Sequence, residues 1–256
     1  MIPTASGKLE AFEHLTELRQ RLLVSVAVLV AAFFGCFAMA KPIFAVLVHP
    51  LLAAGEGRLI YTDVFEAFFA EVRVALFAAL MICFPLFAMQ AWRFVAPGLY
   101  ATEKRALLPF LLLTPLFFAG GACFAYFLAM PWALHFLLGF EGNIGGVQRE
   151  ALPGVGNYLS FVTRFLFGFG VAFLLPLVLV LAQRIGLVTR EQLAAKRRYA
   201  IVIAFAISAV LTPPDVISQF MLAVPLWLLY EGALLTMRLT GPTRREAAAA
   251  VPLGAG

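Results

Sequence analysis

Acidic side chains near the start of the chain are the first candidates for a binding site. Glu17 lies in the segment 8–22, where apolar residues fall on one half of a helical wheel and mainly acidic residues on the other. This pattern predicts an amphipathic helix on the membrane surface that leads into a span. Two interpretations of Glu17 stay open: an ion pair with Arg21, four residues later on a solvated face, or a carboxylate site for a basic peptide.

Glu103 is the second candidate. It follows a Pro97-Gly98 turn in the loop after the second predicted span. Taken alone, it is an ordinary loop glutamate that Lys104 would neutralise. Taken with Glu17, it supplies a second carboxylate on the same side of the membrane. Two carboxylates on one surface suit a pair of guanidinium groups, because the planar fork of arginine binds a carboxylate with two parallel hydrogen bonds.

Other chemistries have no suitably spaced residues. The cysteines and histidines are far apart along the chain, at Cys36, Cys83, Cys123, His14, His49 and His135. No HExxH, Walker-type GxxxxGK[ST] or GxSxG motif occurs. The sequence therefore predicts neither a metal site nor a cofactor site, and it favours a protein that is not an enzyme.

The composition indicates what must position the two glutamates. Of the 256 residues, 63% are hydrophobic and only 13% are charged, and the mean hydropathy is +0.95. That leaves too little polar surface for a water-soluble domain. We predict an all-α polytopic membrane protein with six transmembrane helices, at approximately residues 22–40, 74–92, 108–135, 158–182, 199–212 and 216–237.

The last two predicted helices differ from the others, and we expect both to be short. Residues 199–212 would span only about 21 Å, less than the roughly 30 Å hydrocarbon core. Pro213-Pro214-Asp215 then separates them from the final helix. A re-entrant hairpin and a pair of short helices that thins the bilayer are both compatible with this pattern. Thr212 and Gln219 flank the turn, where they either bind a polar residue of another membrane helix or satisfy their own turn.

The distribution of positive charge predicts the topology. Six spans with both termini inside place most of the 19 Lys and Arg residues, including Lys196-Arg197-Arg198, on the cytoplasmic side. Residues 1–21 are then a cytoplasmic amphipathic helix, residues 22–238 the transmembrane domain, and residues 239–256 a disordered cytoplasmic tail. Residues 41–73 and 139–157 are long outer loops, which usually cap or bind something.

Four motifs in this order resemble the TatC family, the multi-span subunit of the twin-arginine, or Sec-independent, protein translocase. They are His14-Leu15-Thr16-Glu17-Leu18-Arg19, then Phe94 with Pro97-Gly98-Leu99-Tyr100 and Glu103-Lys104, then Phe124-Ala125-Tyr126-Phe127, and finally Leu211-Thr212-Pro213-Pro214-Asp215 with Ser218-Gln219. The resemblance covers roughly residues 10–238. Each motif alone is weak, but their order within six spans makes the resemblance specific.

The resemblance implies a cupped arrangement of the six helices and a role in protein export across the bacterial cytoplasmic (inner) membrane. TatC proteins bind twin-arginine signal peptides of folded cargo and assemble with single-span TatA- and TatB-type subunits in multi-copy complexes. Transport uses the proton-motive force, and no nucleic acid takes part. By resemblance, Glu17 and Glu103 would meet the two arginines, in surroundings shaped by Arg19, Phe94 and Tyr126. The partner helix would dock at Thr212, Asp215 and Gln219, and Pro50 matches a proline that matters in the family.

One position departs from the family pattern. Leu174 stands just before Pro176 in the fourth span, where the family commonly has an acidic or amide residue. Any mechanism that needs a titratable group at mid-membrane is therefore in doubt for this chain. The alternative function is a secondary transporter of a small solute, which would need a midplane site between broken, paired helices. An intramembrane hydrolase would need a nucleophile and base in the spans, and we find no such pair.

Overall fold

A computed structural model describes residues 5–55, 58–95, 101–140, 142–144, 147–149, 152–211 and 216–239 of the chain. Side chains are described from residue 16 onward, except at 56–57, 92–109, 141–151, 212–215, 218 and 240–256. Residues 240–256 of the predicted tail, the two residues Thr212 and Asp215, and the side chains of Phe94 and Glu103 lie outside this part.

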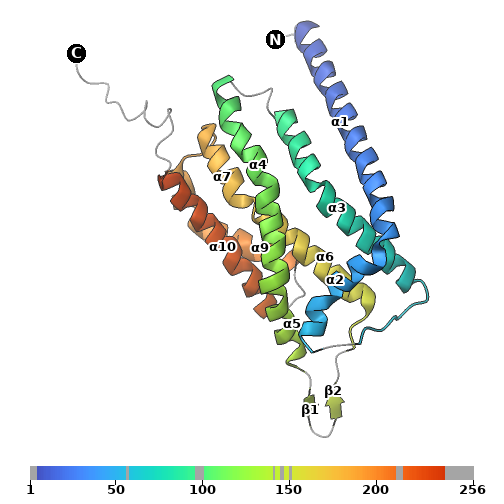
Figure 1. Cartoon of the computed structure of the whole chain (residues 1–256). Coiled ribbons are helices and arrows are strands. Elements are labelled where there is room, and N and C mark those ends of the chain that lie inside the picture. The colour runs from blue at the N-terminus through green and yellow to red at the C-terminus, as the bar shows by residue number, and fades with distance from the viewer. Residues whose placement is uncertain are drawn as a thin grey trace.

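The described chain is almost entirely helical, as predicted (Figure 1). Its elements in order are α1 (Ala5–Ala38), α2 (Ala40–Ala53), α3 (Glu66–Val95), α4 (Ala101–Phe124), the π-helical segment η2 (Ala125–Ala129), α5 (Met130–Leu138), strands β1 (Gly142–Ile144) and β2 (Val147–Arg149), α6 (Val155–Ala172), α7 (Leu175–Arg184), α8 (Arg190–Ala195), α9 (Arg197–Leu211) and α10 (Val216–Leu239). The two strands form one small antiparallel hairpin. Five helical segments are long and apolar enough to cross a membrane, and α9 occupies the predicted fifth span.

The first helix is longer than the predicted span. We expected a surface helix over residues 1–21 that leads into a span from 22 to 40, and α1 joins the two regions in one helix of 34 residues. No proline or glycine lies between Lys8 and Leu22, so nothing in the sequence ends the helix where its character changes from amphipathic to apolar. Among its described side chains only Cys36 is buried.

The first predicted outer loop is partly helical, which corrects our expectation for Pro50. Residues 40–53 form α2, and Pro50 is buried inside this helix rather than in a loop. Proline has no N–H to donate to the carbonyl four residues earlier, which is that of Val46. The hydroxyl of Tyr126 donates to this carbonyl instead, at 2.8 Å. Tyr126 thus supplies the hydrogen bond that Pro50 removes from α2.

This compensation predicts an energetic coupling between the two residues. Tyr126→Phe should lower the free energy of unfolding by about 1 kcal/mol, because the Val46 carbonyl loses its donor. In a Pro50→Ala background the cost should be smaller, since the new backbone N–H can reach the same carbonyl. Unfolding titrations of the purified protein in detergent would measure both values.

Tyr158 offers a matched control for this cycle. Its hydroxyl donates to the carbonyl of Leu47 at 2.9 Å, and the residue four positions later, Leu51, is not a proline and keeps its backbone N–H. The cost of Tyr158→Phe should therefore not depend on residue 50. An equal cost of Tyr126→Phe with proline and with alanine at position 50 would contradict the assignment.

The fourth predicted span, residues 158–182, is broken into α6 and α7. The amide of Leu174 bonds to the carbonyl of Val171 at 3.0 Å, three residues earlier, and Pro176 lies at the start of α7. Because Pro176 cannot donate to the carbonyl of Ala172, the chain ends one helix and begins the next. Leu174 lies at this junction and is half-buried.

The final pair of helices is only partly as expected. Helix α9 has 15 residues and is short, as predicted. Helix α10 has 24 residues, so the expectation that both would be short is wrong for the last one. It continues through Pro225 and ends two residues beyond the predicted end at Met237. Of these last two helices, only α9 is therefore too short to cross the hydrocarbon core alone.

Helix α6 lies at the centre of the bundle (Figure 1). Its side chains Leu159, Val162 and Phe165 are fully buried and belong to the largest core cluster, together with residues of α2, α3, η2, α5, α9 and α10. Helix α1 lies at one edge and packs mainly against α3. This central and peripheral division decides which helices can move without disturbing the core.

Candidate functional site

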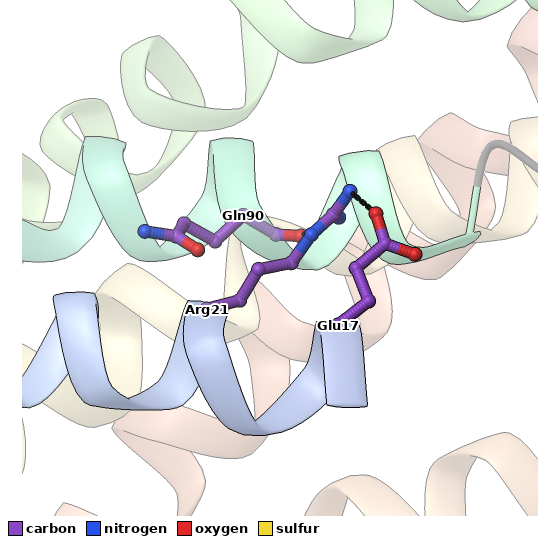
Figure 2. Close-up of polar contacts among 3 residues, drawn as sticks. All are labelled: Glu17, Arg21 and Gln90. Carbon is purple, nitrogen blue, oxygen red and sulfur yellow. Dashed lines mark hydrogen bonds and ion pairs between the residues drawn. The ribbon is translucent and has the colours of Figure 1, made fainter. Parts of the chain in front are cut away.

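The Glu17 carboxylate lies on α1 beside α3 and is already paired. Figure 2 shows the guanidinium of Arg21 between the Glu17 side chain and the backbone of Gln90. Arg21 donates to Glu17 through one terminal nitrogen and to the Gln90 carbonyl through the other, at 3.4 Å. The predicted i,i+4 ion pair is confirmed. The two bonds also link α1 to α3, a contact that sequence reasoning did not find.

A groove begins at this ion pair and runs between α1 and α3. It has a volume of 490 Å³, and Arg21 and Gln90 are among its lining residues. The rest of its wall is largely apolar, with Leu22, Val26 and Leu29 from α1 and Phe87 from α3. The spacing of these α1 residues marks one helix face. Sequence reasoning missed the groove, although that spacing was visible, because all faces of a membrane span are apolar.

The helix ends that carry the other predicted residues lie near the start of α1. Figure 1 shows the beginning of α1, the end of α3 and the beginning of α4 at the same end of the bundle. Phe94 is the second-last residue of α3 and Glu103 the third residue of α4, with side chains outside the described part. Arg19 is exposed on α1. A carboxylate pair formed by Glu17 and Glu103 is compatible with this arrangement.

Tyr126 and Pro50 lie elsewhere. Both belong to the region around α2, which begins where α1 ends. A rise of about 1.5 Å per residue places Glu17 roughly 30 Å from Ala38 along the helix. The structure therefore places the Tyr126 hydroxyl on the α2 turn that precedes Pro50, and not beside Glu17. The bond from Tyr126 to the Val46 carbonyl supports the backbone of α2.

Comparisons with known proteins agree with these observations. A family model described as Sec-independent protein translocase protein (TatC) matches residues 13–225. The chain belongs to the TatC family. The TatC of Magnetococcus marinus is 43% identical over 221 residues, which cover 86% of this chain and 80% of that protein. The TatC of Aquifex aeolicus is 41% identical over 237 residues, covering 91% and 97%.

A solved structure shows the same architecture. The crystal structure of a twin-arginine translocase receptor TatC superposes with a TM-score of 0.78 at 41% sequence identity, covering 88% of this chain and 98% of that one. With the apolar helices described above, these matches show a multi-pass membrane protein of a protein translocase family, and they confirm the predicted resemblance.

The region predicted to contact a partner helix in this TatC-family chain is described only at Gln219. Its amide nitrogen donates to the carbonyl of Phe205 at 3.1 Å, which joins α10 to α9. This bond favours the interpretation in which Gln219 satisfies the turn between its own helices. The two flanking residues Thr212 and Asp215 lie outside the described part of the chain.

The opposite end of the TatC bundle has a polar cluster that sequence reasoning did not find. We call Thr62, Glu66, Arg73 and Gly156, which lie in the two predicted outer loops, the outer latch. The Glu66 carboxylate accepts from the Gly156 amide at 2.6 Å and from the Thr62 hydroxyl at 2.9 Å, and Arg73 donates to the Gly156 carbonyl at 2.8 Å. These bonds join α3 to the start of α6 across about ninety residues of sequence, a separation that no local pattern could predict.

The described residues offer no metal site. Among them, no three or more His, Cys, Asp or Glu side chains gather closely enough to hold an ion.

Proposed function

We propose that this chain is the receptor subunit of a twin-arginine translocase. It binds the Arg-Arg signal peptides of folded proteins at the face that carries Glu17 and Glu103. It then assembles with single-span TatA- and TatB-type partners for export driven by the proton-motive force. The family membership and the likeness to a solved twin-arginine translocase receptor support this role. The single observation that carries the docking site is the half-exposed Glu17 carboxylate beside an apolar groove.

Docking at this face is an exchange of ion pairs. The resting Glu17 is neutralised by Arg21, so an incoming guanidinium competes with a residue of the chain itself. Arg21 also holds the Gln90 carbonyl, which keeps it near the site after displacement. Such an exchange between partly exposed charges yields modest, salt-sensitive affinity. The apolar groove next to the pair provides a surface for the hydrophobic stretch of the peptide, and this adds affinity that salt does not weaken.

The proposed orientation has both termini in the cytoplasm of a bacterium, with the chain in the inner membrane. The Lys196-Arg197-Arg198 cluster at the start of α9 supports it, because positive charge at the ends of spans stays on the inner side. The subunit would act by binding and assembly rather than by catalysis. The alternative, a small-solute transporter, gains no support from relatives that are translocase proteins.

Peptide binding to purified variants tests the proposal. Glu17→Gln and Glu103→Gln should each weaken binding of a fluorescent twin-arginine peptide by about tenfold, since each removes a charge-assisted hydrogen bond. A peptide with Lys-Lys in place of Arg-Arg should bind the parent protein more weakly, because the bidentate fork is lost. Fluorescence anisotropy in detergent, at two salt concentrations, would measure these values.

Glu191→Gln is the matched control, because Glu191 is exposed on α8, a helix that does not form the proposed docking face. Its variant should bind the peptide like the parent. Unchanged peptide affinity in the Glu17→Gln, Glu103→Gln double variant would remove the docking site from the proposal. Failure of the parent chain to co-purify with single-span partners from native membranes would remove the assembly role.

A further inference from the structure

A second cavity lies among α7, α8, α9 and α10, away from the docking face. Its volume is 230 Å³. Apolar side chains line most of it, including Leu175 and Leu179 from α7 and Ile203 from α9. The hydroxyl of Tyr230 on α10 donates to the carbonyl of Leu193 on α8 at 2.8 Å, which holds α8 against this wall. A cavity of this size is too small for a helix, whose diameter is about 10 Å, but it is wide enough for a hydrocarbon chain.

Two cations lie beside the cavity. Lys196 is its only charged lining residue and is exposed. The guanidinium of Arg198 lies 5.0 Å from the centre of the Tyr199 ring, and Tyr199 also lines the cavity. Within the described part of the chain, the adjacent Arg197 has an ion pair, with Glu231 at 2.9 Å, whereas no ion pair is seen for Lys196 or Arg198. Two positive charges therefore remain at the edge of an apolar space.

We propose that this cavity binds one acyl chain of an anionic phospholipid, whose phosphate is held by Lys196 and Arg198. The apolar lining matches the chain and the two cations match the headgroup, so one molecule satisfies both. Lysine suits a phosphate as a compact charge, and arginine adds a fork of donors. The site shares no residue with the peptide-docking face, so it stands or falls independently of the receptor proposal.

Lipid titration of the delipidated full-length protein tests the assignment. Native mass spectrometry would count bound dioleoyl phosphatidylglycerol and dioleoyl phosphatidylcholine, which have the same chains but different net charge. We expect phosphatidylglycerol to bind about tenfold more tightly. The Lys196→Gln, Arg198→Gln double variant should lose this preference. Inorganic phosphate at millimolar concentration should not displace the lipid, because it does not fill the cavity.

Two further variants separate the chain from the headgroup. Ala200→Phe should fill part of the cavity and weaken both lipids alike; if this variant melts below the parent, Ile203→Trp replaces it, at a more exposed position. Arg238→Gln, an exposed charge at the end of α10, is the control and should bind both lipids like the parent. Equal binding of the two lipids by the parent, a preference retained by the double variant, or no loss on filling the cavity would each overturn the proposal.

Discussion

Replacing Gly121 with alanine is expected to destabilise the bundle by about 3 kcal/mol, near the upper end of the usual cost of overpacking. A Cβ atom at this position would lie 2.5 Å from the backbone oxygen of Phe169 and 2.8 Å from the Phe173 side chain. The backbone oxygen cannot rotate away as a flexible side chain could. Small residues in membrane helices let two backbones approach closely. With alanine at this position, helices α4 and α6 must therefore separate.

Gly120 provides the comparison within the same helix. A Cβ atom there would have no neighbour within 4 Å, and alanine favours a helix over glycine by up to about 1 kcal/mol. Gly120→Ala should therefore be neutral or slightly stabilising. Unfolding midpoints in the same detergent would compare the two variants. Equal midpoints would show that α4 and α6 are not held as closely as described.

Loss of the Glu66 carboxylate is expected to release the outer latch. In Glu66→Gln, an NH2 group replaces one of the two oxygens that accept from Gly156 and Thr62. A hydrogen-bond donor of the glutamine then faces a donor of Gly156 or Thr62. We expect amide hydrogen exchange at residues 62 and 156 to accelerate by about tenfold or more, because a charge-assisted hydrogen bond is lost. Mass-spectrometric exchange on the detergent-solubilised protein would locate the change.

Glu71→Gln is the control for this experiment. Glu71 lies five residues further along α3 and does not contribute to the latch, so its variant should exchange like the parent. Gly156→Ala offers an independent approach to the same contact, since its Cβ atom would lie 2.9 Å from the Glu66 carboxylate oxygen and must push it away. Unaltered exchange at residues 62 and 156 in both Glu66→Gln and Gly156→Ala would mean that the latch does not hold α3 to the start of α6.

Local patterns in the sequence were enough to predict most of the helices. Long apolar segments predicted the spans, and the i,i+4 spacing predicted the ion pair between Glu17 and Arg21, which is confirmed. Helix α2 was missed because residues 41–73 contain turn-forming residues, and the tyrosine that compensates Pro50 lies 80 residues from the Val46 carbonyl that it bonds. The break at Leu174 was predicted only as a proline within a span, since local sequence does not show whether a helix bends or ends.

The candidate site could be predicted as residue types but not as geometry. The two glutamates follow from charge and position, whereas the contact from Arg21 to the Gln90 backbone depends on how α1 packs against α3. The outer latch and the α4–α6 contact at Gly121 likewise join residues far apart in the chain. Distant pairings of this kind depend on the whole bundle.

The uninterrupted length of α1 has a mechanical consequence. Its backbone hydrogen bonds make it a stiff rod, and it packs mainly against α3, with only Cys36 buried among its described side chains. Such a rod would pivot near Met39, where α1 ends and α2 begins. A sideways pull on the Glu17 end, by any molecule bound there, would be felt as a torque on α2 at the far side of the bilayer.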